Sequence, residues 1–351
     1  MYKKLSIFTL VTVAVIIAAA IFASMRAPQS AKEKPLFFPE LKQRIEDVSH
    51  IQIKSFDDTI NLARMNNTWG IEEFDGYPAL PDKVKSTVLG TADLKLNAPK
   101  TALERLYPRL GVEGPIADES TSKLLTLKDA AEQTIVEVIV GKPRRSSAAQ
   151  STPGLYVRIP DEEQSYLVDG VLELSAKKTD WIERSLLDIP ADAIKRVQVE
   201  HPDGDSYVLF KQQKGQENFE VENLPEGKKA APEIILNRYA AILADVQISS
   251  ARKQGTFSDI QDRINTTIHT FDGLQISMQA FKADGRPYAS FEFMLADTAN
   301  GEEEAEIDQA ELQQYVSNMN SKLNDWVFEI QGFKYDIVTN KSDKLYRDAS
   351  K

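Results

Sequence analysis

The segment of residues 48–74, VSHIQIKSFDDTINLARMNNTWGIEEF, decides the kind of fold that this chain adopts. Its apolar residues alternate with polar residues in three short runs, which the polar sequences SFDD and MNNT separate. The alternating apolar residues are Ile51, Ile53, Ile60, Leu62, Trp69 and Ile71. A period of two that is broken by turns predicts an antiparallel meander of three strands with one buried face.

A helix is predicted directly after this meander. The segment of residues 80–96, LPDKVKSTVLGTADLKL, has a proline at its second position and then places Val84, Val88 and Ala92 at helical spacing. Proline is favoured in the first turn of a helix, and this spacing gives the helix one apolar face. The closing DLKL predicts a short strand.

The same patterns return in the second half of the chain. Residues 194–221, IKRVQVEHPDGDSYVLFKQQKGQENFEV, again contain alternating runs, and residues 231–248, APEIILNRYAAILADVQI, repeat the helix and the strand. Further on, TIVEVIVGK at 134–142 and LQISMQAFK at 274–282 both alternate as strands do. A tandem duplication explains this agreement. Chance similarity between two unrelated α+β domains is the alternative.

Two of the three tryptophans lie in similar surroundings. TDWIERSLLDI at 179–189 and NDWVFEIQGFKYDI at 324–337 both place Trp after Asp and end in Asp-Ile. A large aromatic side chain is well suited to close a small core of strands and helices. We therefore expect Trp181 and Trp326 to occupy equivalent buried positions, one in each repeat. Stacking of a ligand on these rings is the alternative.

These patterns predict an α+β fold with five parts. The expected order is an N-terminal signal-anchor transmembrane helix at 1–25, a tether at 26–45, a first repeat at 46–190, a second repeat at 192–338 and a tail at 339–351. Each repeat is expected to be a mostly antiparallel sheet with packed helices.

The N-terminus carries the membrane prediction. Lys3 and Lys4 precede an uncharged run from Leu5 to Met25, which as a helix would be about 31 Å long at about 1.5 Å per residue. That length crosses a hydrocarbon core of about 30 Å. A cleaved signal peptide with a site near Ala23 is the alternative, but the apolar run is longer than such peptides usually have.

Phe37 and Phe38 stand out in the tether. They are expected either to pack onto the first repeat or to contact a membrane partner.

Composition narrows the classes of function. The chain has 42% hydrophobic and 27% charged residues, as foldable globular proteins do, and a net charge of −11 from 53 acidic and 42 basic residues. An acidic body disfavours binding to nucleic acid, because phosphate contacts depend on clustered Lys and Arg. The absence of Cys excludes disulfides, thiol catalysis and Cys-ligated zinc.

The chain resembles a known family at the residues that form the predicted strands. The pattern I-x-I…I-x-L-x-R…W-x-I at 51–71, the helix with its leading proline, and LYVRI…YLV at 155–168 are similar to the domain of unknown function 4340 family. The resemblance covers about residues 46–260. It implies a membrane anchor and a periplasmic or external body, and some members are auxiliary components of an ABC-type transport system related to gliding motility. It supplies no catalytic residues.

Residues with catalytic or metal-binding chemistry are sparse. The three histidines, His50, His201 and His269, lie far apart in the sequence, and none has a partner at the spacing of a helical metal site. Each is expected at a strand edge or turn. No nucleophile elbow or phosphate-binding loop motif occurs. We therefore predict no catalytic, cofactor-binding or metal-binding residues and no cofactor.

Three loops have a second interpretation. Asp203 and Asp205, in HPDGDS, begin like a calcium loop but lack its closing Glu, so a hairpin turn is expected. The acidic run GEEEAEID at 301–308 is expected to be a solvated loop, with weak cation binding or a basic partner as the alternative. Arg144 and Arg145 lie in a predicted hairpin loop, and carboxylate or phosphate binding is the alternative.

The predicted function is a non-catalytic, membrane-anchored accessory or scaffold protein of an envelope complex. Its expected partner is a membrane protein such as an ABC-type transporter, and no nucleic acid. The predicted location is the inner (cytoplasmic) membrane, with a single pass and the bulk of the chain in the periplasm. A ligand-binding module for peptide, glycan or lipid is the first alternative, and an envelope enzyme is the second.

Overall fold

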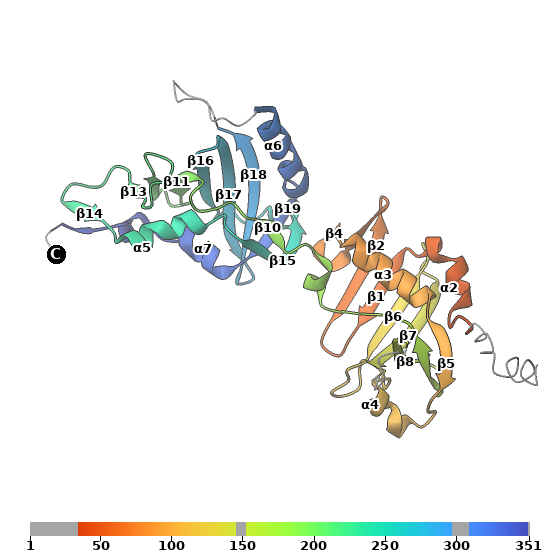
Figure 1. Ribbon diagram of the computed structural model, residues 1–351. Coiled ribbons are helices and arrows are strands. Elements are labelled where there is room, and N and C mark those ends of the chain that lie inside the picture. Colours follow the sequence, from red (N-terminus) through yellow and green to blue (C-terminus); the bar gives the residue numbers. More distant parts are fainter. Residues whose placement is uncertain (1–33, 145–151, 297–308, 350–351) are drawn as a thin grey trace, which may run out of the picture.

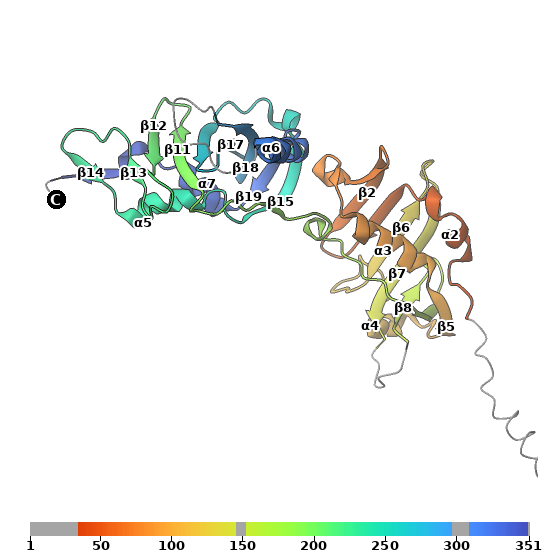
Figure 2. The ribbon, with the colours of Figure 1, turned by 45° about the horizontal axis from the view of Figure 1, so that its top comes forward.

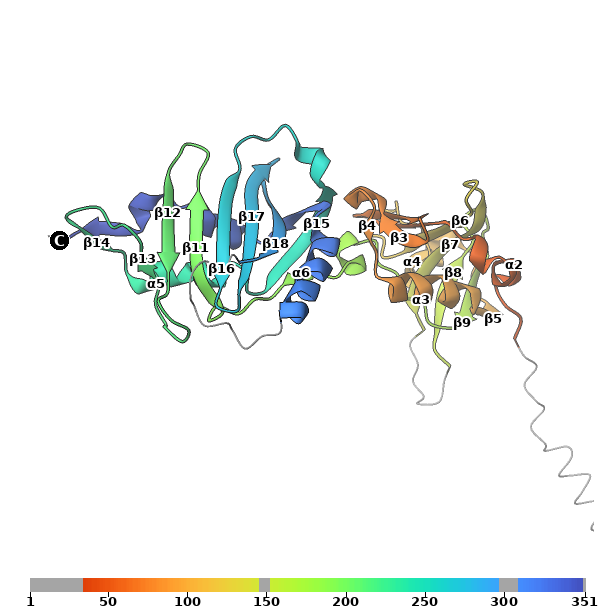
Figure 3. The same cartoon turned by 90° about the horizontal axis from the view of Figure 1, so that it is seen from above.

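The protein consists of two large antiparallel sheets that lie end to end, as the computed structural model shows (Figure 1). The structure describes residues 34–144, 152–296 and 309–349. The first sheet and the second sheet lie along one axis, with the described N-terminal residues at one end of the body and the C-terminus at the other (Figure 2). The β4 side of the first sheet meets the β15 side of the second (Figure 3).

Nine strands form the first sheet within the described residues, in the order β4-β3-β2-β1-β6-β7-β8-β9-β5. The strands are β1 (His50–Lys54), β2 (Thr59–Met65), β3 (Thr68–Ile71), β4 (Tyr77–Pro78), β5 (Lys95–Pro99), β6 (Lys123–Lys128), β7 (Thr134–Pro143), β8 (Gly154–Arg158) and β9 (Ser165–Asp169). Ile51, Ile53, Ile60 and Leu62 are at most 1% exposed, so the alternating residues do face the core. The predicted meander is confirmed as β1, β2 and β3.

Nine further strands form the second sheet within the described residues, in the order β10-β15-β19-β18-β17-β16-β11-β12-β13. They are β10 (Ser185–Leu187), β11 (Ile194–Glu200), β12 (Ser206–Phe210), β13 (Glu220–Val221), β15 (Val246–Lys253), β16 (Ile264–Thr270), β17 (Leu274–Ala283), β18 (Arg286–Leu295) and β19 (Trp326–Ile330). A separate two-stranded ribbon pairs β14 (Lys228–Ala230) with β20 (Tyr346–Asp348).

Eight strands follow the same order in both sheets. The order β3-β2-β1-β6-β7-β8-β9-β5 in the first sheet corresponds to β13-β12-β11-β16-β17-β18-β19-β15 in the second. The registers agree as well, since Leu62 pairs with Ile71 in the first sheet and Leu209 pairs with Val221 in the second. The extra strands, β4 and β10, lie at the two sheet ends that face each other. The exact limits of the two repeats stay a prediction.

Helices are few among the described residues. They are α2 (Pro39–Gln43), α3 (Pro81–Ala92), α4 (Tyr107–Leu110), α5 (Glu233–Leu236), α6 (Gln309–Leu323) and α7 (Gly332–Val338). The short 3-10 helices are η1 (Ile45–Asp47), η2 (Glu72–Phe74), η3 (Glu104–Leu106), η4 (Lys178–Trp181), η5 (Asn237–Ala241), η6 (Gln254–Phe257) and η7 (Ser342–Lys344). In the first sheet, α3 lies across one face and buries Val84 and Val88 (Figure 1).

The predicted α+β class is therefore wrong, because the described body is mainly antiparallel sheet. The second predicted helix shows the reason. It breaks after four residues, and the chain continues as the 3-10 helix η5. Asn237, where η5 begins, accepts a hydrogen bond from the Phe219 backbone amide at 3.1 Å and donates to Asn218 at 2.7 Å. These hydrogen bonds tie the start of η5 to the residues before β13.

The transmembrane helix in the predicted fold also needs correction. No helix in the described part of the chain combines the length and the apolar character that crossing a bilayer requires. The predicted anchor at Leu5–Met25 lies outside the described residues. A single-pass membrane helix is accordingly not part of the fold described here.

The second half of the predicted tether is part of the first sheet's body. Leu36 forms a bridge to Lys95 on β5, and Leu41 is fully buried. Phe37 packs edge-on against Tyr166 with ring centroids 5.4 Å apart. Phe37 and its neighbour Phe38 therefore pack onto the first sheet, as one of the two sequence interpretations held.

A buried carboxylate fastens this N-terminal segment. Asp169, on β9, accepts a hydrogen bond from Lys34 at 2.5 Å and from Asn97 at 2.6 Å, and Arg144 lies 3.5 Å away. Burial alone would raise the pKa of Asp169. The hydrogen bonds from Lys34 and Asn97 outweigh burial and hold this pKa below the ordinary 3.8.

We predict that Asp169→Asn loosens the N-terminal segment, because the amide cannot offset the charges of Lys34 and Arg144. The Phe37 amide, which donates to the Leu94 carbonyl at 2.7 Å, should exchange its hydrogen about tenfold faster, equivalent to about 1.4 kcal/mol. Hydrogen exchange read by mass spectrometry at pH 7 measures this. Asp47→Asn, which removes an exposed ion-pair partner of Arg44, is the control and should change little.

The effect of Asp169 should depend on pH in one direction. Because its folded pKa lies below 3.8, the stabilisation is complete well above that pH and is lost as the pH falls through the folded pKa. The wild type and the Asn variant should therefore converge in acid. Equal exchange rates at pH 7 would contradict the role given to this carboxylate.

Trp181 and Trp326 are both buried but do not occupy equivalent places. Trp181 ends the 3-10 helix η4, whereas Trp326 begins β19, the strand that corresponds in sheet order to β9. The prediction of equivalence is therefore wrong. In the second sheet, the strand that corresponds to β9 is β19, which follows α6 in the chain. The similar local sequences around the two tryptophans therefore have different structural roles.

Candidate functional site

The junction between the two sheets is centred on one carboxylate of the first sheet's body. Asp75 directly follows the 3-10 helix η2 and has a φ of 53°. Its Oδ2 atom accepts hydrogen bonds from Arg252 Nε at 2.8 Å, the Lys253 backbone amide at 3.0 Å and Thr256 Oγ1 at 2.9 Å. All three donors belong to the second sheet's body, so this single oxygen connects the two halves.

The residues around Asp75 favour the charged form of its carboxylate. Burial would raise its pKa, but the hydrogen bonds from Arg252, Lys253 and Thr256 and the charge of Arg252 outweigh burial, so the pKa is lowered from 3.8. The carboxylate is therefore ionised at neutral pH and holds its donors as charge-assisted hydrogen bonds.

Aromatic rings pack beside this carboxylate. Tyr77, on β4, meets Trp326 edge-on with ring centroids 5.0 Å apart, and it meets Phe328 at 5.9 Å. Lys253 places its ammonium 3.9 Å from the centroid of the Trp326 ring. Burial raises the pKa of Tyr77, and nearby Glu183 adds to this effect. Rings from both halves therefore share one packed cluster.

The segment of the chain that joins the two sheets is also ordered. The Trp181 carbonyl accepts a hydrogen bond from the Leu80 amide at 2.7 Å, which ties the connection to the start of α3. Residues 185–187 then form β10, which pairs with β15 of the second sheet. The link between the sheets is thus itself a strand, and the junction combines backbone pairing, an ion pair and aromatic packing.

A cavity of about 510 Å³ lies next to the junction. Its lining residues are Arg252, Thr256, Phe257, Asp259, Ile260, Lys282, Ala283, Asp284 and Tyr288. All of them belong to the second sheet's body, and four are charged with both signs present. This cavity is not an apolar cleft between the two halves.

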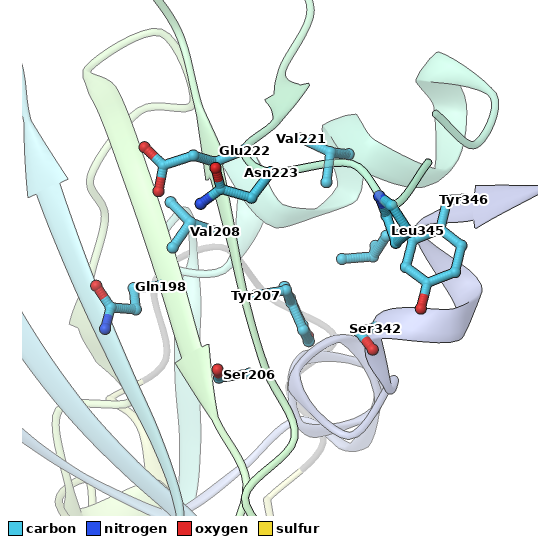
Figure 4. Close-up of a pocket in the computed structure, with 11 residues that line it drawn as sticks. Gln198, Ser206, Tyr207, Val208, Val221, Glu222, Asn223, Ser342, Leu345 and Tyr346 are labelled. Atoms are coloured by element: carbon cyan, nitrogen blue, oxygen red, sulfur yellow. The ribbon is translucent and has the colours of Figure 1, made fainter. Parts of the chain in front are cut away.

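A second cavity, of about 240 Å³, lies at the far end of the second sheet (Figure 4). It is lined by Gln198, Ser206, Tyr207, Val208, Val221, Glu222, Asn223, Pro225, Ser342, Leu345 and Tyr346. One wall comes from β11, β12 and β13, and the other comes from the C-terminal residues before and within β20 (Figure 4). The predicted tail at 339–351 therefore contributes to the body.

The structure does not bring the three histidines together. His50, on β1, lies 3.4 Å from the Asp129 carbonyl through Nδ1. His201 is buried, and its Nε2 lies 3.0 Å from the Asn340 carbonyl. His269 lies on β16, where burial lowers its pKa.

The HPDGD sequence forms a turn that holds the C-terminal segment. Asp205 accepts hydrogen bonds from the Ser342 amide at 2.9 Å and from its hydroxyl at 2.6 Å. Asp203 accepts two hydrogen bonds from Lys341, at 2.6 and 2.7 Å. The two carboxylates therefore bind protein groups. Among the residues that the structure describes, no group of three or more His, Asp or Glu side chains has metal-binding geometry.

The other two loops singled out in the sequence are described only in part. Arg144 contacts Asp169, as given above, whereas Arg145 lies outside the described residues. The acidic run at 301–308 also lies outside them.

Sequence reasoning missed both Asp75 and the far-end cavity. The contacts of Asp75 lie more than 170 positions away in sequence, so no local spacing reveals them. The one available signal is the DG pair at 75–76, which predicts a turn but not its partners.

Comparison with known families finds one that matches much of the chain. A model described as a domain of unknown function, DUF4340, matches residues 69–288. The match runs from β3 to β18 and so includes both sheets and the junction. No curated protein and no solved structure matches the chain.

Proposed function

We propose that this chain, which belongs to the DUF4340 family of unknown function, is a non-catalytic accessory or scaffold protein of a cell-envelope complex. The junction is the observation that carries this proposal. A scaffold must present its surfaces in a fixed relation, and the Asp75 hydrogen bonds, the Tyr77 ring cluster and the paired strand β10 all fix one sheet against the other.

The chemistry of the surface is consistent with a protein partner. The net charge of −11 disfavours nucleic acid, because phosphates repel an acidic body. A membrane protein such as an ABC-type transporter is the partner that we propose. Location at the inner membrane, with the bulk of the chain in the periplasm, stays a prediction that cell fractionation tests.

The ligand-binding alternative requires a site between the two halves. The cavity beside the junction is lined by second-sheet residues alone, and Arg252, Asp259, Lys282 and Asp284 make its lining strongly charged. Most sites for small organic ligands are predominantly apolar. This cavity therefore does not favour capture of an apolar ligand between the sheets.

The test is crosslinking of intact cells followed by affinity purification of the full chain. We expect one set of envelope proteins to be recovered in fixed proportion to the chain. A variant with His50, His201 and His269 all changed to Gln should recover the same set, because the structure does not bring the three side chains together and the rings of His50 and His201 face carbonyls of the chain itself. The purified protein should not hydrolyse peptide, glycan or phosphate substrates.

Two results would contradict the scaffold proposal. One is recovery of the chain alone from crosslinked cells. The other is a hydrolase activity that the triple His variant loses while it keeps its fold by circular dichroism. The second result would favour an envelope enzyme instead.

A further inference from the structure

The junction inside the chain is a head-to-tail contact between two bodies with the same strand order. The β4 end of the first sheet meets the β10 and β15 end of the second, so each body uses a different surface (Figure 3). A contact between different surfaces leaves one surface of each kind unused. The outer end of the first sheet is at β5, and the outer end of the second is at β13 and β14 (Figure 3). Each outer end is therefore the counterpart of a surface that the junction uses.

The outer end of the second sheet carries a counterpart of the junction carboxylate. Gly76 and Gly227 both have a positive φ, of 83° and 76°, and a short strand, β4 or β14, follows each directly. The same number of residues then leads to the proline at the start of α3 or α5. The residue before the glycine is Asp75 in the first body and Glu226 in the second. A carboxylate is thus present at this position in both.

The outer end of the first sheet carries a counterpart of the junction guanidinium. The pairing of β5 with β9 shifts in register after Leu96, and the pairing of β15 with β19 shifts after Ile248. Lys100 and Arg252 follow these two residues at the same spacing. A 3-10 helix, η3 or η6, comes next in each body. The first sheet therefore has a lysine where the second has the arginine that binds Asp75.

Both counterpart side chains are available at the surface. Lys100 and Glu226 are exposed, and neither side chain forms a hydrogen bond or an ion pair with another residue that the structure describes. Exposed apolar side chains stand near both in the sequence, since Leu103 is 51% exposed and Leu224 is 38% exposed. The two outer ends therefore offer opposite charges together with apolar surface, which is the complementarity that favours a specific contact.

We propose that copies of this chain associate head to tail, with the β13 and β14 end of one copy against the β5 end of the next. Glu226 of one copy would pair with Lys100 of the other, as Asp75 pairs with Arg252 at 2.8 Å inside the chain. Because the contact joins two different surfaces, each added copy leaves one of each kind free, and the assembly grows as an open chain. This inference goes beyond the scaffold function, since the assembly needs no envelope partner.

The test is sedimentation velocity of the purified full chain over a range of concentrations. The average sedimentation coefficient should rise continuously with concentration. Lys100→Glu and Glu226→Lys each place like charges across the contact, and each should weaken self-association at least about tenfold. Lys85→Glu on α3 and Glu311→Lys on α6 change the net charge equally but lie away from both outer ends, so they are the matched controls and should assemble as the wild type does (Figure 1).

A mixture of the two end variants separates a direct contact from a folding defect. In the mixture, Glu226 of the Lys100→Glu chain can meet Lys100 of the Glu226→Lys chain, and the two substituted residues also carry opposite charges. Assembly should therefore return when the variants are mixed, although each alone stays monomeric with an unchanged circular dichroism spectrum.

Four results would overturn the proposal. The first is a sedimentation coefficient of the wild type that stays constant as the concentration rises. The second is a dimer that grows no further, because this would indicate a two-fold contact. The third is assembly of either end variant alone to the same extent as its control. The fourth is a mixture of the end variants that stays monomeric.

Discussion

Replacement of Trp181 by Ala is expected to lower the free energy of unfolding by about 3–5 kcal/mol, as large deletions in a core do. The Trp181 side chain is fully buried. Its ring nitrogen donates to the Ser175 carbonyl at 2.9 Å, and the Lys83 ammonium lies 4.9 Å from the ring centroid. The truncation would leave a cavity and an unpaired Ser175 carbonyl at the start of the connection between the two sheets.

Urea denaturation monitored by circular dichroism measures this change. Trp69→Ala is the matched control, because Trp69 belongs to the same sheet's body but is half-buried, and it should cost less. Trp181→Phe keeps most of the apolar volume and should fall between the wild type and Trp181→Ala. A loss below about 1 kcal/mol for Trp181→Ala would contradict its role as a core residue.

Replacement of Asp75 by Ala is expected to uncouple the two sheets. Three hydrogen bonds converge on one oxygen of Asp75, and one of the donors is the Arg252 guanidinium. Both side chains are partly exposed, at 25% and 36%, so solvent weakens the ion pair. We expect a total loss of about 1–3 kcal/mol, mostly from the hydrogen bonds to a charged acceptor.

Differential scanning calorimetry measures the uncoupling. The wild type should unfold in one transition, whereas Asp75→Ala should show two, because each sheet keeps most of its own core. Asp325→Ala is the control, since the Asp325 side chain is 79% exposed and its carboxylate lies 3.5 Å from Lys253 within the second sheet's body. A single unshifted transition for Asp75→Ala would show that the carboxylate does not couple the sheets.

The strands were the most predictable part of the fold. Alternation of apolar residues located β1, β2 and β3, and in β1 and the first half of β2 it follows from burial of one face only. The same signal located β11, β12 and β17. Pairing between neighbouring strands followed from short turns. Local patterns with a period of two were therefore enough wherever a strand pairs with its neighbour in sequence.

Helices and long-range order were less predictable. The apolar spacing around Ile235 and Tyr239 resembles a helix, but the chain forms only the four residues of α5 and continues as the 3-10 helix η5. After α6 the chain comes back to the second sheet and forms β19 between β15 and β18. No local sequence pattern indicates this position. The shared Asp-Trp sequence was therefore misleading, because similar local sequences lie in different elements.

The candidate sites depend on contacts that only the fold creates. Asp75 and Arg252 are far apart in sequence, and the cavity at the far end of the second sheet is completed by residues near the C-terminus. What the sequence did indicate was the separation of the three histidines. His50 lies beside the Asp129 carbonyl in the first sheet's body, whereas His201 lies beside the Asn340 carbonyl in the second and His269 lies on β16.

The central claim is that the two sheets form one rigid body, and the distance between two spin labels tests it most directly. The chain has no Cys, so labels on Ser86→Cys in α3 and Ser321→Cys in α6 report only on these sites. Pulsed electron resonance should give one narrow distance distribution for this doubly labelled chain and a broad one when Asp75→Ala is added. A broad distribution with Asp75 in place would contradict the account, because sheets that move freely cannot hold partners in a fixed relation.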